Sequence, residues 1–425
     1  MRAANISFVL AVVSAVLFST AFLLPVEGRS ILAYVLFAVV LISVILFFLP
    51  FKTIVQPDAK PGKRVDERDI MFARARLQPG SAAYEDYYQT KPETKIRDDL
   101  FRKEPGLLNE KARFYDPILF STSKGGFFLT EALRDTVDGA VAGSKVDTSN
   151  MDLSSYMKSL ARYMGAIHVG IAKTKPYHYY SHIGRGTGVY GDEIKIEHKY
   201  ALVFSVEMDY EMIGANPLAP GVVESAREYI EAAKIAVVIA ATIREMGYEA
   251  RAHIDGNYRV IAPLIARDAG LGEIGRMGLL ITPNLGPRVR LGVVTTNLPL
   301  KIDDRNLDPS VIDFCNICRK CASGCPTQAI SFEARQDIDG ALRWKLDSDR
   351  CFKYWVQCGT DCGRCMTICP YAHKDNYLHK GIRWGIKKSW LFRRFALNMD
   401  DFFYGKKPSR RTPPKWMCSI QHKIR

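Results

Sequence analysis

The 425-residue sequence lacks the short motifs that mark common hydrolases and nucleotide-dependent enzymes. It contains no G-x-S-x-G motif and no P-loop. It also lacks H-E-x-x-H and a facial carboxylate triad, so a separate catalytic zinc or iron ion is not expected. G-x-G-x-x-G occurs at Gly270, Gly272 and Gly275, but the preceding segment looks helical and no acidic residue follows near position 295. A tight loop is therefore favoured over nicotinamide or flavin binding.

The basic excess of the chain is concentrated at its C-terminal end. The formal net charge is +14. From Lys380 to Arg425 there are thirteen Lys or Arg residues against Asp400 and Asp401, a net charge of +11. Such a tail could meet RNA, anionic lipid or an acidic redox partner.

Two apolar runs near the N-terminus, Asn5 to Leu24 and Ile31 to Phe51, are each about 20 residues long, the length of a membrane-spanning helix. They predict a two-helix transmembrane hairpin over residues 1–51. A cleavable signal peptide is less favoured, because the first run is too long and a second follows directly. The flanking Lys and Arg residues place both ends in the cytoplasm, and no twin-arginine signal suggests export. We therefore expect an inner-membrane protein whose remaining chain faces the cytoplasm.

A Pro- and Gly-containing linker at 52–64 leads into a predicted α/β or α+β core at 65–305. The helical spacing of Tyr156, Leu160, Tyr163 and Ile167 predicts a helix near 156–171. A long amphipathic helix is predicted over 220–247. The segments HKYALVFSVEMDY and RVRLGVVTTNLPL are typical of buried strands. The glycine-rich loop YHYYSHIGRGTGVYGDEI favours a cofactor cavity, to which we assign His182, Gly184, Gly186, Gly188 and Tyr190.

Nine of the ten cysteines lie in one stretch and form two groups. The first group is spaced C-x2-C-x2-C-x3-C-P and contains Cys315, Cys318, Cys321 and Cys325. The second ends as C-x2-C-x3-C-P and contains Cys351, Cys358, Cys362, Cys365 and Cys369. Bacterial two-cluster ferredoxins share this run. A zinc site needs only four ligands, and tight C-x2-C pairs with an odd cysteine left over argue against disulfides. We predict two 4Fe–4S clusters within 306–378, followed by a basic, aromatic tail at 379–425.

The order of motifs resembles the reductive dehalogenases, which are corrinoid- and iron–sulfur-dependent enzymes. The most specific segments are PYHYYSHIGRGTGVYG, HKYALVFSVEMDYEM, IREMGYEARAHI, AGLGEIGRMGLLITPNLGPRVRLGVVTTNLPL and GTDCGRCMTICP. The resemblance implies a nitroreductase-like core with a base-off corrinoid and a C-terminal dicluster ferredoxin domain. The absence of D-x-H-x-x-G, a source of a lower histidine ligand in other corrinoid proteins, agrees with base-off binding.

The resemblance also implies roles for particular residues. Tyr229 corresponds to the catalytic proton donor, and its basic partner to either Arg288 or Arg290. Asp255 corresponds to a polar residue at the site. A guanidinium beside the phenol would lower its pKa from about 10 toward the working range. In the implied reaction two single electrons reach Co(I) through the clusters, halide leaves the organohalide, and Tyr229 supplies a proton.

Crossover ligation predicts one cluster on Cys315, Cys318, Cys321 and Cys369. The second takes Cys325, Cys362 and Cys365, and the family pattern adds Cys351 as its fourth ligand, with Cys358 as the alternative. Cys418 is expected to be a free thiol. No reductase domain is fused to the chain, so we expect an external electron donor, either a ferredoxin, a flavodoxin or a quinol-linked protein.

Two other functions stay open at this point. Epoxyqueuosine reductase also couples a corrinoid to two 4Fe–4S clusters, but it acts on tRNA and extends into helical repeats, so no nucleic-acid partner is expected here. The second is a membrane-bound iron–sulfur electron carrier without corrinoid. Membrane lipid is an expected partner in either case, because the tail is basic. A respiratory and a catabolic role are both compatible with the sequence.

Overall fold

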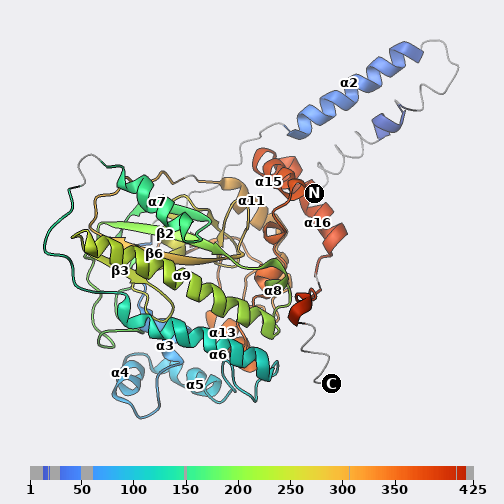
Figure 1. Cartoon of the computed structure of the whole chain (residues 1–425). Coiled ribbons are helices and arrows are strands. Elements are labelled where there is room, and N and C mark those ends of the chain that lie inside the picture. Colours follow the sequence, from blue (N-terminus) through green and yellow to red (C-terminus); the bar gives the residue numbers. More distant parts are fainter. Residues whose placement is uncertain are drawn as a thin grey trace. The chain divides into compact units, whose positions relative to one another are not determined.

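The computed structural model describes residues 13–17, 19, 29–48, 61–147, 151–305, 307–407 and 409–417 (Figure 1). The chain divides into two compact units. Unit 1 comprises Met1–Gln56, Asp308–Arg319 and Lys374–Pro408. Unit 2 comprises Pro57–Leu307, Lys320–His373 and Ser409–Arg425.

The predicted transmembrane hairpin is not supported. Most of its first run, Asn5 to Leu24, lies outside the described residues, and the second run contains helix α2, Arg29–Phe48. In the part of the chain that the structure describes, no helix combines the length and apolar character needed to span a bilayer.

A four-stranded antiparallel sheet forms the centre of unit 2. Its strands run in the order β1 (His168–Lys173), β2 (Tyr200–Glu207), β6 (Val289–Thr296) and β3 (Ala250–His253). Strands β2 and β6 pair over their whole lengths, from Tyr200 opposite Thr296 to Glu207 opposite Val289. Both were predicted from their β-branched apolar runs, which suit a sheet buried on both faces.

Helices cover both faces of this sheet. On one face, α9 (Ala219–Glu245) and α7 (Leu153–Tyr163) bury a cluster that includes Leu202, Phe204 and Val294. On the other, α10 (Ala262–Asp268) packs against alternate residues such as Val203 and Val293. Figure 1 shows α9 running across the strands, with α6 (Pro117–Ala132) beside it. The core is therefore α/β, as predicted.

The helix predicted near 156–171 is shorter than expected. Helix α7 ends at Tyr163, and β1 begins at His168. Tyr156, Tyr163 and Ile167 of the predicted apolar stripe are exposed, whereas Met157 and Ala161 are buried. Large aromatic side chains therefore indicated the wrong face, and small or flexible ones fill the contact with the sheet.

The glycines of G-x-G-x-x-G form a loop between a helix and a short hairpin, as predicted. Helix α10 precedes them, and the hairpin strands are β4 (Glu273–Ile274) and β5 (Leu280–Ile281). Gly270 has φ +79°, a value that favours glycine, and a Cβ at Gly272 would collide with the carbonyl oxygen of Ile281.

The remaining elements of unit 2 are an N-terminal arm, loops around the sheet, and short elements that carry cysteines. The arm contains η1 (Glu67–Asp69), α3 (Met71–Arg74), α4 (Ala82–Thr90) and α5 (Pro92–Phe101). Around the sheet lie η2 (Arg134–Thr136), η3 (Pro176–His178) and α8 (Tyr210–Gly214). The cysteine region contains α12 (Lys320–Ser323), β7 (Gln336–Ile338), β8 (Ala341–Arg343), α13 (Ser348–Cys358), α14 (Arg364–Thr367) and η4 (Pro370–Ala372).

Unit 1 gathers α2, α11 (Pro309–Cys318), α15 (Tyr377–Lys388) and α16 (Trp390–Tyr404). Helices α15 and α16 pack against each other and against α11. The buried Arg393 side chain of α16 donates through Nε to Asp313 Oδ2 of α11 at 2.8 Å, and Arg393 Nη1 donates to the Ile386 carbonyl of α15 at 2.9 Å. One buried guanidinium thus joins three helices of this unit.

Candidate active site and cluster-binding residues

The phenol of Tyr229 and the guanidinium of Arg290 lie in direct contact. Tyr229 is in the first half of α9, and Arg290 is the second residue of β6. Arg290 Nη1 donates to the Tyr229 hydroxyl at 3.2 Å, and its Cζ lies 4.0 Å from the centroid of the phenol ring. The cation therefore both hydrogen-bonds the reactive oxygen and stacks on the ring, which fixes the tyrosine side chain.

The net pKa shift of Tyr229 is upward, opposite to the direction expected from its arginine alone. Burial raises the pKa of Tyr229, Arg290 opposes that rise, and Asp255 and Asp361 add to it. Tyr229 therefore carries its proton at neutral pH. Burial lowers the pKa of Arg290, but neighbouring Tyr229 and Asp361 more than compensate, so its pKa is raised and the guanidinium stays charged. A protonated phenol beside a permanent cation is suited to giving up a proton.

A serine and an aspartate extend this pair, and the sequence did not reveal either one. Arg290 Nη2 donates to Ser225 Oγ at 3.0 Å, and the Ser225 hydroxyl donates to Asp361 Oδ2. Asp361 lies in the loop between Cys358 and Cys362. Burial raises the pKa of the Asp361 carboxyl, while Ser225 and Arg290 oppose that rise. The chain Tyr229–Arg290–Ser225–Asp361 connects the phenol to a cysteine-bearing loop.

Arg288 has a different set of contacts. Its side chain is 1% exposed. Its Nε donates to the Ala372 carbonyl at 2.9 Å, and its Nη1 donates to Glu207 Oε1 at 3.0 Å and to the Met208 carbonyl. Arg288 thus fastens the ends of β2 and β6 to η4, and Arg290 is the arginine that contacts Tyr229.

Further side chains surround the phenol. The ring of Phe127 lies 6.0 Å from that of Tyr229, centroid to centroid. Burial raises the pKa of Tyr258 well above its usual range, and Tyr229 and Asp255 reinforce the rise. The predicted Asp255 is within electrostatic range of Tyr229 and also pairs with Arg134, whose Nη2 is 3.6 Å from Asp255 Oδ2. Tyr258 was missed by sequence reasoning because nothing about its spacing distinguishes it from a core tyrosine.

The glycine-rich loop packs tightly on neighbouring segments. The backbone N–H of Gly184 donates to Glu67 Oε2 at 2.9 Å, and a Cβ on Gly184 would lie 2.7 Å from the Glu67 backbone. Gly186 has φ +84°, and a Cβ there would overlap the side chain of Asn257. Gly188 has φ +95°. The glycines are therefore required by close approach and by backbone conformation.

The two other predicted loop residues, His182 and Tyr190, differ in their hydrogen-bond partners. His182 Nδ1 lies 2.9 Å from Ser181 Oγ and 3.2 Å from Asp66 Oδ2. The Tyr190 hydroxyl is buried and finds no hydrogen-bond partner in the part of the chain that the structure describes, and burial raises the pKa of Tyr190 to about 12. A buried hydroxyl without a partner is costly unless a bound group supplies one.

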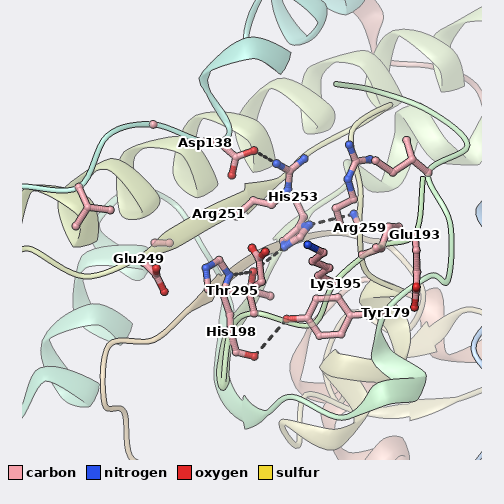
Figure 2. Close-up of a pocket in the computed structure, with 16 residues that line it drawn as sticks. Asp138, Tyr179, Glu193, Lys195, His198, Glu249, Arg251, His253, Arg259 and Thr295 are labelled. Atoms are coloured by element: carbon pink, nitrogen blue, oxygen red, sulfur yellow. Dashed lines mark hydrogen bonds and ion pairs between the residues drawn. The ribbon is translucent and has the colours of Figure 1, made fainter. Parts of the chain in front are cut away.

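A pocket of about 490 Å³ adjoins this loop (Figure 2). It is lined by sixteen residues, among them Tyr179 and Ile183 near the loop and Arg251, His253 and Thr295 from the sheet. Tyr229 is not among them. Burial and repulsion by Arg259 lower the pKa of Arg251 to about 9. The guanidinium of Arg251 forms an ion pair with Asp138.

Two histidines of the pocket have tautomers that the hydrogen bonds determine (Figure 2). The backbone N–H of Arg259 donates to His253 Nδ1 at 3.2 Å, so the proton of the neutral ring is on Nε2, which donates to Thr295 Oγ1 at 2.9 Å. The Thr295 hydroxyl then donates to His198 Nδ1 at 2.8 Å, which leaves a proton on His198 Nε2. Burial lowers the pKa of both histidines, so both are neutral. The pocket thus offers the His198 Nε2 proton and three basic side chains, alongside four carboxylates: Lys195, Arg251, Arg259, Asp138, Glu193, Glu197 and Glu249.

Four cysteines predicted for the second cluster are electrostatic neighbours in unit 2. Cys325, Cys351 and Cys362 all act on the thiol of Cys365, and Cys325 also acts on Cys351. Burial raises the pKa of Cys351 to about 11 and that of Cys362 to about 12. Such buried thiols become thiolates when a metal binds them.

Cys358 is fully buried, and the Tyr354 hydroxyl bonds to its thiol, which partly offsets the upward effect of burial on its pKa. Cys351, Cys358 and Cys325 all act on the thiol of Cys362. Cys351 therefore stays the predicted fourth ligand of this cluster, with Cys358 as the alternative.

The first-cluster cysteines are distributed over both units. Cys315 and Cys318 are in α11 of unit 1, and Cys321 and Cys369 are in unit 2. The nine described cysteines form no disulfide. Among described residues no three His, Cys, Asp or Glu side chains converge on one metal ion, and a 4Fe–4S cluster with its four cysteines does not need such convergence on a single atom. Cys418 lies outside the described residues.

Comparison with known proteins gives consistent matches. Residues 314–373 match the 4Fe-4S dicluster domain family. The tetrachloroethene reductive dehalogenase of Sulfurospirillum multivorans is 33% identical over 295 residues, covering 61% of this chain and 58% of the relative. That of Desulfitobacterium hafniense is 37% identical over 192 residues, covering 43% of this chain and 34% of the relative. The epoxyqueuosine reductase of Listeria monocytogenes is 29% identical over only 118 residues.

Solved structures give matches of wider coverage. The catabolic reductive dehalogenase NpRdhA in complex with 3-bromo-4-hydroxybenzoic acid has a TM-score of 0.68 at 29% identity, covering 85% of this chain and 49% of that chain. A reductive dehalogenase structure linked to B12-dependent dehalogenation has a TM-score of 0.66 at 30% identity, with 84% and 49% covered. The chain thus spans about half the length of these relatives.

Proposed function

We propose that the chain is a reductive dehalogenase, like the relatives that it matches over about half of their length, and that it reductively removes halide from a small organohalide. The observation that carries the proposal is the contact between Tyr229 and Arg290. It places a protonated phenol beside a permanent cation, within a core that matches B12-dependent relatives. The bound halogenated aromatic of NpRdhA makes a haloaromatic the first substrate class to test.

The corrinoid proposed for this chain would be held by the glycine-rich loop and the adjoining pocket. A corrinoid carries amide side chains and, in its complete forms, a phosphodiester, so its periphery is rich in acceptors. Arg251 and His198 Nε2 provide donors in the pocket, and the Tyr190 hydroxyl has no hydrogen-bond partner among the described residues. When bound and reduced, the corrinoid supplies the electrons that break the carbon–halogen bond. Base-off binding is supported by the missing D-x-H-x-x-G motif.

Tyr229 supplies the proton that replaces the halogen. Its raised pKa keeps the proton on the phenol until negative charge develops on the substrate carbon. Arg290 then stabilises the phenolate that is left, because its guanidinium already donates to that oxygen. Ser225 and Asp361 hold the arginine in this orientation. The protein thus contributes orientation and a proton, while the redox chemistry belongs to the cofactors.

Electrons are proposed to enter through two 4Fe–4S clusters from an external donor. The dicluster match covers all eight predicted ligands. Attachment at the inner membrane with the core facing the cytoplasm stays a proposal from the charge pattern alone. Cell fractionation with protease accessibility of the C-terminus tests it.

The experiment that tests the function is anaerobic purification followed by cofactor and turnover measurements. We expect cobalt, about eight iron atoms per chain, and halide release from 3-bromo-4-hydroxybenzoic acid or tetrachloroethene with a strong artificial reductant. Tyr229→Phe should retain both cofactors and lose about 10²- to 10⁴-fold in turnover, the usual contribution of a general acid. Tyr163→Phe, at an exposed position, is the matched control.

Three outcomes would contradict the proposal. Iron without cobalt after reconstitution would favour the electron carrier, and reduction of epoxyqueuosine in tRNA would favour that rival enzyme. Undiminished turnover by Tyr229→Phe would remove the assigned proton donor.

A further inference from the structure

Helix α15 of unit 1 carries aromatic and basic side chains on one exposed face. Apart from Leu378, its exposed positions recur at intervals of three and four, which places them on one side of a helix: Tyr377, Lys380, Gly381, Trp384, Lys387 and Lys388. Tyr377 is 94% exposed and Trp384 is 57% exposed. The buried residues His379, Gly385 and Ile386 hold the helix, and a Cβ on Gly385 would lie 2.6 Å from the Phe392 ring of α16.

The C-terminal end of α16 adds to this region. His379 Nε2 and the Tyr404 hydroxyl are 3.2 Å apart, so the end of α16 lies beside the start of α15. Phe402 and Phe403 there are 78% and 70% exposed. The exposed Lys406 and Lys407 follow. We name the set the aromatic–basic surface: Tyr377, Lys380, Trp384, Lys387, Lys388, Phe402, Phe403, Lys406 and Lys407.

The surface carries five lysines, and the partly exposed Asp400 and Asp401 precede Phe402. Helix α15 contains four Lys or Arg residues and no Asp or Glu. Lys380 Nζ is 3.5 Å from Asp375 Oδ2, and Lys387 Nζ is 3.8 Å from Asp308 Oδ2. Both lysine side chains are nevertheless more than half exposed. Such pairs are weak in water, so the ammonium groups can respond to an external anionic surface.

We propose that the aromatic–basic surface docks the chain on an anionic lipid bilayer. Exposed Trp, Tyr and Phe side chains on the same face as lysines are the composition of helices that lie in the headgroup region. Helix α2 of the same unit contacts α16 and exposes Tyr34, Val35 and Leu41, a further apolar surface. The proposal does not require either N-terminal run to cross the membrane.

The test is hydrogen–deuterium exchange of the full chain with vesicles of phosphatidylcholine alone or with added phosphatidylglycerol. The readout is local, so attachment through another segment does not mask it. We expect slowed exchange over 377–388 and 402–407 with the anionic vesicles only. Lys380→Gln/Lys387→Gln/Lys388→Gln should shift the lipid concentration at half-protection by roughly fivefold per lysine.

A matched control is Lys111→Gln/Lys124→Gln/Lys199→Gln, which removes the same charge from exposed positions of unit 2 and should leave protection unchanged. Tyr377→Ser/Trp384→Ser should weaken protection while keeping its dependence on anionic lipid. Equal protection by both vesicle types would overturn the proposal. So would lipid-independent protection that rises with protein concentration, which would identify a second copy as the occupant, or protection only by an added ferredoxin or flavodoxin.

Discussion

Arg288 and Arg290 are two residues apart, yet their contacts predict opposite consequences of substitution. Arg290→Gln removes the cation that stabilises the phenolate of Tyr229, so we expect a turnover loss of about 10²-fold with a smaller loss of stability than Arg288→Gln causes. Arg288→Gln instead removes a buried charge that bonds two carbonyls and Glu207, so destabilisation of about 3 kcal/mol is expected. Turnover and thermal unfolding of both variants check the separation. If Arg288→Gln lost turnover and Arg290→Gln lost mainly stability, Arg288 would be the catalytic partner of Tyr229.

The hydroxyl of Ser225 joins Arg290 to Asp361, and this predicts non-additive effects. Ser225→Ala leaves the buried Asp361 carboxylate without its donor and should cost about 1–3 kcal/mol of stability. In an Asp361→Asn background the same change should cost clearly less, because no buried charge is left unpaired. Melting temperatures of the two single variants and the double variant form the cycle. Additive losses would show that the two side chains do not depend on each other.

At the scale of elements, the first half of α9 combines Tyr229 with the buried carboxyl of Glu228. Burial raises the pKa of Glu228 to about 7 although Arg227 opposes the rise. The folded state therefore binds a proton more tightly than the unfolded state between about pH 4.5 and 7, and stability falls as pH rises through that window. Glu228→Gln should raise the melting temperature at pH 8, by an amount equivalent to about 1–2 kcal/mol, and change it little at pH 5. Melting curves at both pH values test this, and an equal effect at both would contradict the assigned shift.

The central elements could be predicted from sequence, but the partner of Tyr229 could not. Apolar, β-branched runs identified β2 and β6, and helical spacing identified α9, because each signal is local. Arg288 and Arg290 have the same parity, so strand alternation cannot separate them. What separates them is that β6 begins at Val289, which leaves Arg288 in the preceding turn. Asp361 meets Ser225 across 136 positions, a contact that no local pattern encodes.

At the scale of the whole molecule, we propose that electrons enter through the clusters and that the carbon–halogen bond is broken near Tyr229. The electron path depends on which cysteines hold the second cluster. Cys351 and Cys325 act electrostatically on Cys365, and Cys358 acts on Cys362 while the Tyr354 hydroxyl bonds to its thiol. We take Cys351 as the ligand because the family resemblance implies it. Cys351→Ala should therefore lower iron from about eight to about four atoms per chain and abolish turnover with a donor that reduces only the clusters. Cys358→Ala, the matched control, should keep about eight. Iron analysis and electron paramagnetic resonance of the dithionite-reduced proteins measure this. A Cys351→Ala protein with both cluster signals, together with a Cys358→Ala protein lacking one, would reverse the assignment.

The same variants also bear on catalysis. Asp361 lies in the loop between Cys358 and Cys362, and it orients Arg290 through Ser225. Loss of the second cluster should therefore disturb the Tyr229–Arg290 contact as well as the electron path.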